Sequence, residues 1–146
     1  MDPILDPILE PFAGAWTLAR LIEDFRAETV LRLEGQARLT PAEGGLAYEE
    51  EGTLALADGT RVAAARRYLW QTRGALIEIL FEDGRPFHAF DPAQSRPAAR
   101  HDCAPDDYEV AYGLEDLAGG RWTAAWRVRG PRKDYRMVSR YCRAAT

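Results

Sequence analysis

The fold is decided by the last strand-forming stretch of the chain, Gly130 to Arg143, which reads GPRKDYRMVSRYCR. A closed antiparallel barrel must pair its first strand with its last, and the first strand here begins around Gly14-Ala15-Trp16. We therefore expect the two ends of the chain to meet in one sheet. The last strand has two alternating faces, and the sequence leaves open which one points inward: Tyr135, Met137, Ser139 and Tyr141, or Arg136, Val138, Arg140 and Cys142.

The same period-two pattern recurs between these ends, in segments separated by Gly, Pro and Asp. Connections such as Ala57-Asp58-Gly59 have the chemistry of hairpin turns, so consecutive strands should be antiparallel neighbours. Because closing such a sheet removes its edges, we predict an all-β fold, a single antiparallel up-and-down β-barrel of about ten strands. Besides the strand near Trp16, the expected strands are residues 28–40, 46–56, 60–71, 75–82, 86–91, 100–104, 107–114, 121–130 and 133–143.

The N-terminal segment differs from the rest. Residues 2–12 read DPILDPILEPF, where the first two prolines each follow an Asp that can cap a helix start. We expect a short helix that covers one end of the barrel. No linker or tandem repeat divides the 146 residues, a length typical of one core, so residues 1–146 are predicted to form a single domain.

Composition narrows the functional classes. The formal net charge of -4, from 19 basic and 23 acidic residues, argues against a general nucleic-acid binder. The chain has neither a secretory signal nor an apolar run of the roughly 20 residues needed to cross a bilayer, so we expect a cytoplasmic protein without a membrane partner. The two cysteines, Cys103 and Cys142, are expected to be free, buried thiols. Its oligomeric state is not predicted.

Gly14-Ala15-Trp16, together with Arg140 on the final strand, resembles the calycin arrangement of lipocalins, fatty-acid-binding proteins and nitrobindin-type barrels. The resemblance implies that a cation from the last strand packs on the Trp ring, a contact that cation–π attraction would support. Nitrobindin-type barrels hold haem through a His on one of their strands. Neither His88 nor His101 can be matched to the corresponding strand of this sequence. Whether haem binds therefore stays open, and the cofactor is unknown.

Three further segments resemble an uncharacterised bacterial family defined as a domain of unknown function. They are FEDGRPFH at residues 81–88, HDCAPDDY at residues 101–108 and GPRKDYRMVSRY at residues 130–141. This resemblance spans most of the chain. It supports a single domain and implies no activity.

The candidate functional residues are polar side chains expected at or inside the barrel. His88 and His101 lie in or beside adjacent predicted strands and could act as a base or as hydrogen-bond donors, whereas two histidines without a third ligand make a metal site improbable. Arg85 could clamp an anion. Alternation places charged groups on inward faces, where they must pair with each other or with a ligand. The predicted ligand-binding residues are Glu50, Arg66, Tyr68, Arg85, His88, His101, Tyr108, Trp126 and Arg140.

These residues support a protein that binds a small amphipathic or anionic ligand inside a lipocalin-like barrel. One alternative is an isomerase or hydrolase with His88 or His101 at the barrel mouth, and no catalytic residue is assigned for it. The other alternative is a non-catalytic interaction module, in which Arg132, Lys133 and Arg136 dock an acidic surface. Each polar residue also has a purely structural interpretation, as a side chain satisfied by its neighbours.

Overall fold

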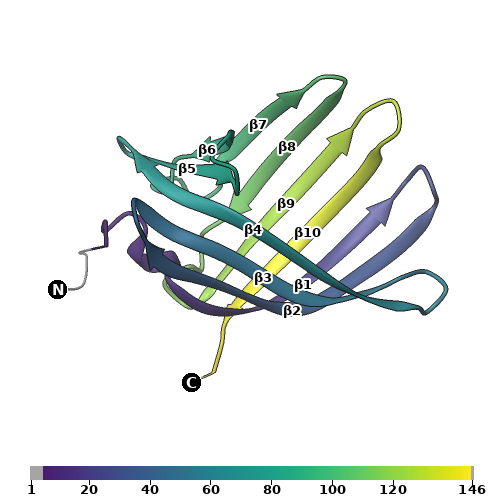
Figure 1. Ribbon diagram of the computed structural model, residues 1–146, viewed down its shortest axis with the longest axis horizontal. Helices are drawn as coiled ribbons and strands as arrows, with labels where there is room; N and C mark the ends of the chain where they lie inside the picture. The colour runs from purple at the N-terminus through teal and green to yellow at the C-terminus, as the bar shows by residue number, and fades with distance from the viewer. Residues whose placement is uncertain (1–4, 146) are drawn as a thin grey trace.

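The computed structural model describes residues 5–145, which form one ten-stranded antiparallel sheet curled into a nearly closed barrel (Figure 1). This confirms the predicted all-β barrel. The strands are β1 (Gly14–Asp24), β2 (Thr29–Ala42), β3 (Gly45–Ala55), β4 (Arg61–Arg73), β5 (Leu76–Phe81), β6 (Pro86–Phe90), β7 (Ala98–Cys103), β8 (Asp106–Gly113), β9 (Arg121–Arg129) and β10 (Asp134–Arg143).

The two ends of the chain meet as expected. β1 pairs with β10 from Trp16 opposite Arg143 to Asp24 opposite Tyr135, and within the described residues each strand also pairs with the next in sequence, except that β6 does not pair with β7. The sheet order therefore runs β6-β5-β4-β3-β2-β1-β10-β9-β8-β7, and its two edges are strands from the middle of the chain. Side chains close the seam between these edges, where the rings of Phe87 on β6 and His101 on β7 lie 5.2 Å apart.

The N-terminal segment is less helical than predicted. Residues 2–4 of the expected helix lie outside the described residues, and the remainder forms a turn held by Asp6 followed by one 3-10 turn, η1 (Glu10–Phe12). Pro11 sits inside η1 and has no backbone N–H to continue a hydrogen-bonded helix. Within residues 5–145, no helix has the length and apolar character required to span a membrane.

This segment closes one end of the barrel. The Phe12 ring enters the interior and packs 5.2 Å from Trp70 and 5.5 Å from Trp122. The buried indole of Trp16 donates its Nε1–H to the Phe12 carbonyl oxygen at 2.9 Å, which ties the turn to β1. Aromatic rings packed edge to face in this way stabilise the closed end beyond their burial alone.

The cation on Trp16 is a different residue from the one expected. The Arg143 guanidinium lies 3.9 Å from the Trp16 ring centroid and also donates to the carbonyl oxygens of Ala13 and Pro11. Arg140 is exposed on the outer face of β10, so the expectation that it packs on Trp16 is wrong. The reason is the alternation of side chains along β10. Tyr141 points inward, so its neighbour Arg140 points outward, and Arg143, two residues further on, shares the face of Tyr141.

β9 alternates between an inward and an outward face, as its period-two sequence pattern indicates. Trp122, Ala124 and Val128 are buried, and Trp126 lines the interior. Both cysteines, in contrast, are exposed and not buried as expected. Cys142 follows the inward Tyr141 and faces outward, whereas Cys103 ends β7 at the open end of the barrel.

Candidate ligand-binding site

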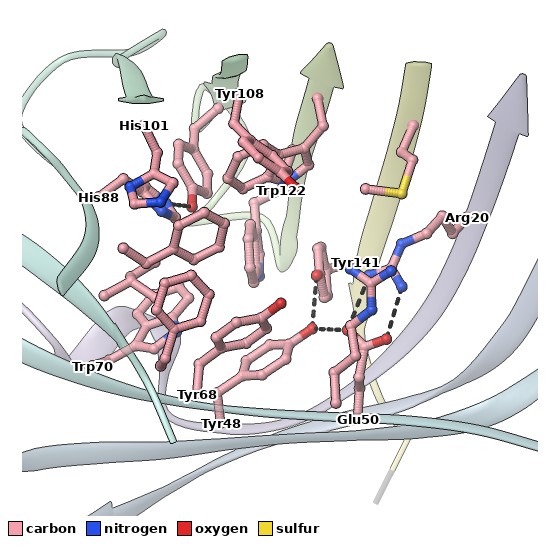
Figure 2. A pocket seen from close by; sticks show the side chains of 18 of the residues that line it. Arg20, Tyr48, Glu50, Tyr68, Trp70, His88, His101, Tyr108, Trp122 and Tyr141 are labelled. Carbon is pink, nitrogen blue, oxygen red and sulfur yellow. Dashed lines mark hydrogen bonds and ion pairs between the residues drawn. The ribbon is translucent and has the colours of Figure 1, made fainter. Parts of the chain in front are cut away.

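The barrel interior contains a cavity of about 260 Å³ between the aromatic closed end and the opposite, open end. Side chains from β1 and from β3 to β10 line it, and its exposed lining residues, Arg66 and Cys103, mark the mouth. Figure 2 shows the two histidines at one side of the cavity and the Arg20, Glu50 and Tyr141 network at the other, with Trp122 between them.

The polar side of the cavity is a buried ion pair. Arg20 donates from both terminal nitrogens to the two Glu50 carboxylate oxygens, at 2.7 and 2.9 Å, and from Nε to Ser139 Oγ at 2.7 Å. The Tyr48 hydroxyl donates to Glu50 at 2.6 Å and lies 2.8 Å from the Tyr141 hydroxyl. Each charged group therefore has several partners, as a buried ion pair requires.

Electrostatics keep this pair ionised. Burial on its own would raise the pKa of the Glu50 carboxyl, but the hydrogen bonds and positive charge of Arg20 outweigh burial and hold that pKa below 4.5. Burial, together with the negative charge of Glu50, raises the pKa of the Tyr48 hydroxyl well above 10.0, so the phenol stays protonated and acts as a donor. The cluster is internally neutral.

Aromatic rings form the facing wall. Phe81 and Phe87 stack with centroids 4.5 Å apart, and Phe87 stacks on Trp126 at 5.2 Å with an interplanar angle of 12°. Phe87 and His88 are consecutive, yet both line the cavity. The pairing of β5 with β6 shifts register between Ile79 and Leu80, and such irregularities redirect side chains next to sites. The wall offers ring faces and edges to a flat ligand.

His88 is almost fully enclosed, with 8% of its surface exposed. Its Nε2 lies 2.6 Å from the Tyr112 hydroxyl, and its Nδ1 has no hydrogen-bond partner within residues 5–145. Burial, with a smaller contribution from His101, lowers the pKa of His88 to about 3, so the imidazole is neutral at pH 7. A base with so low a pKa is poorly matched to proton transfer at neutral pH, which argues against His88 as the base in the hydrolase or isomerase interpretation.

The mouth carries the remaining polar groups. Arg66 is the cross-strand neighbour of Glu50, and in the described part of the chain it makes no ion pair of its own. Tyr108 and His101 lie across from it on β8 and β7, and the Lys133 amino group donates to the Tyr108 hydroxyl at 2.9 Å. Residues 5–145 contain no group of three His, Cys, Asp or Glu side chains placed to hold a metal.

The structure brings most of the predicted residues together and separates two. Arg85 is exposed in the turn between β5 and β6, where it pairs with Asp83, and Arg140 projects from the outer surface. Neither lines the cavity. The predicted residues that do line it are Glu50, Arg66, Tyr68, His88, His101, Tyr108 and Trp126.

Several lining residues were missed from the predicted set, above all Arg20, Tyr112 and Trp122. Arg20 shares the face of Trp16 and Leu18 in the alternation of β1, so the pattern carried a signal for its burial. Its partner could not be found from the pattern, because residues 20 and 50 come together only across β2. Trp122 shares the face of Trp126 in the alternation of β9, which signals its burial but not its contact with the cavity.

Residues 12–143 of the sequence match DUF6314, a family of unknown function. The protein belongs to this family. Membership agrees with the resemblance to a family without assigned activity and adds no substrate or partner. No curated protein matches the sequence.

Among solved structures, the barrel is similar to the S-type phycobiliprotein lyase CPES from Guillardia theta. The TM-score is 0.66 at 7% sequence identity, and the alignment covers 94% of this chain and 91% of that chain. At this identity the likeness extends to the fold alone.

Proposed function

We propose that residues 1–146 act as one calycin-like domain that binds a small, flat, amphipathic or anionic molecule inside the barrel. The observation that carries the proposal is the division of the cavity into a stacked aromatic wall and a cationic mouth, with Arg66 free of an ion pair in residues 5–145. The buried Arg20 charge is already neutralised by Glu50, so Arg66 is the cation left for an anionic ligand group.

The size of the cavity limits the ligand. Pockets that enclose drug-sized ligands measure roughly 300–1,000 Å³, and this cavity of about 260 Å³ is slightly smaller. It therefore suits one or two fused rings, with any larger part of the ligand outside the mouth. The similar structure is named a phycobiliprotein lyase, which makes a bilin-type molecule one candidate, and a bilin would have to protrude from the mouth.

A matched pair of alanines tests the proposal. Ala124 is buried and lines the cavity, while its neighbour Ala125 belongs to the outer face of β9. Leucine at position 124 adds volume inside the cavity, with a packing cost of about 1–3 kcal/mol, whereas leucine at position 125 leaves the interior unchanged. Ala124→Leu should therefore lose ligand binding that Ala125→Leu retains.

The measurement is isothermal titration of both variants and the wild type with 2-naphthoate, biliverdin and haemin, with absorption spectra for the two coloured probes. Wild-type binding of at least one probe, weakened at least tenfold by Ala124→Leu and unchanged by Ala125→Leu, supports the proposal. A wild type that binds none of the three, or binding equally affected by both leucines, contradicts it.

A further inference from the structure

The cavity contains a buried donor without a partner. Trp122 is 2% exposed, and its indole Nε1–H meets no acceptor in residues 5–145. The ring stacks on Tyr141 with centroids 3.7 Å apart and an interplanar angle of 4°, and Phe12 packs against it edge to face, so the ring is held in place. The indole of Trp16, in contrast, donates to the Phe12 carbonyl.

The His88 side chain supplies a second unpaired donor. Tyr112 is buried, and its hydroxyl contacts only His88 Nε2 among the hydrogen-bonding partners found in residues 5–145. If Tyr112 donates to Nε2, the phenol proton is satisfied and the neutral imidazole carries its hydrogen on Nδ1. In the other tautomer, with hydrogen on Nε2, both the phenol proton and the Nδ1 lone pair would be left without a hydrogen-bond partner. The geometry therefore favours an Nδ1–H group that has no acceptor.

Within residues 5–145, neither nitrogen has a hydrogen-bond partner. Both Glu50 carboxylate oxygens are occupied by Arg20, and one also accepts from Tyr48. A buried donor left unsatisfied costs about 1–3 kcal/mol, and most buried polar groups have partners. Trp122 and His88 both line the cavity, and two unpaired donors on its lining residues indicate that a bound molecule completes them.

We infer that the ligand of the proposed cavity carries acceptor oxygens, carbonyl or carboxylate, that receive hydrogen bonds from the Trp122 indole and His88 Nδ1–H. The inference rests on the proposed function and specifies its ligand class: a planar, conjugated molecule with exocyclic oxygens. A flat hydrocarbon would fill the same space and leave both donors unpaired. Ordered water could also satisfy the donors, and ligands with and without an oxygen would then bind alike.

Two planar probes of the same shape separate these cases: 2-acetylnaphthalene, which has a carbonyl oxygen, and 2-isopropenylnaphthalene, which has a methylene group in its place. Both are neutral, so Arg66 does not distinguish them. We expect wild-type protein to bind the ketone roughly fivefold to tenfold more tightly, the contribution of about one hydrogen bond. Isothermal titration measures both dissociation constants.

The affinity ratio of the two probes within one variant cancels general effects on packing. Trp122→Phe removes one donor, and His88→Leu combined with Tyr112→Phe removes the other without stranding the Tyr112 hydroxyl. The preference for the ketone should fall in the variant that lacks the donor it uses, and should vanish when all three substitutions are combined. Equal binding of the two probes by the wild type, or binding of neither, overturns the inference, whereas the proposed function is decided separately by the titrations with 2-naphthoate, biliverdin and haemin.

The imidazole tautomer gives an independent test that needs no ligand. Nitrogen-15 NMR of the labelled, full-length protein distinguishes a protonated ring nitrogen from an unprotonated one, and the double variant identifies the His88 signals. We expect hydrogen on Nδ1. Hydrogen on Nε2 would overturn the inference, whatever the outcome of the titrations.

Discussion

Two buried polar clusters face each other across this barrel, and only one of them is complete. At one side Arg20 donates two hydrogen bonds to Glu50 and a third to Ser139, and Glu50 also accepts one from Tyr48. His88 at the other side, and Trp122 between the two sides, each keep a ring nitrogen without a partner in residues 5–145. A cluster whose polar groups all have partners needs no ligand to be stable in the folded protein. A cluster with unpaired groups can gain its missing hydrogen bonds from a ligand. The comparison separates residues that hold the fold from residues that select the ligand.

The largest effect should come from breaking the complete cluster. Glu50→Ala leaves the Arg20 guanidinium buried and unpaired, so we expect the free energy of unfolding to fall by about 3–5 kcal/mol. Glu51→Ala, at the exposed neighbouring position, should change it by no more than about 0.5 kcal/mol. Urea denaturation measures both.

The double variant Arg20→Met/Glu50→Leu sharpens this result. It removes both charges together, so it should recover most of the stability that Glu50→Ala loses. A single Glu50→Ala variant that loses less than about 1 kcal/mol would contradict the structural importance of the pair, and a double variant as unstable as the single one would place the loss in packing.

The second effect concerns the incomplete cluster and pH. Burial lowers the folded-state pKa of His88 to about 3, below its ordinary value of 6.5, so below pH 6.5 the unfolded chain takes up a proton that the folded protein excludes. This contribution to stability is present above pH 6.5 and is lost as pH falls towards 3. We expect the wild type to lose about 2 kcal/mol from this group between pH 8 and pH 5.

Urea denaturation between pH 8 and pH 5 measures that slope, in a range that lies above the pKa of Glu50. In His88→Leu/Tyr112→Phe this contribution should be absent, whatever the stability of the variant at pH 8. Equal slopes in the two proteins would show that His88 is not held neutral by burial.

A smaller effect distinguishes two arginines on β10. Arg143→Ala removes the cation on Trp16 and the donors to Ala13 and Pro11, so it should cost about 1–2 kcal/mol. Arg140→Ala, on the outer face, should stay within about 0.5 kcal/mol of the wild type. Thermal or urea denaturation of the pair decides between them, and a greater loss from Arg140→Ala would contradict the observed register.

These same residues show which parts of the fold and of the cavity the sequence predicts. Period-two alternation and turn chemistry, which are local patterns, were sufficient for the ten strands, and the pairing of β1 with β10 followed from the closure of the barrel. The cation on Trp16 was assigned to the wrong residue because the inward face of β10 was undetermined, and a shift of one residue exchanges the faces. Sequence also missed the Arg20 partner and the unpaired nitrogens, which depend on pairing across β2 and on side-chain packing.

The four tryptophans test the central claim, that the cavity is a ligand site, most directly. Trp70, Trp122 and Trp126 line the cavity, whereas Trp16 lies at the closed end with its indole N–H donated to the Phe12 carbonyl oxygen. In a proton–nitrogen NMR titration with 2-naphthoate, the indole signals of Trp122 and Trp126 should shift saturably while that of Trp16 stays nearly fixed. Cavity tryptophan signals that do not move, or a Trp16 signal that moves as much as theirs, would contradict the account.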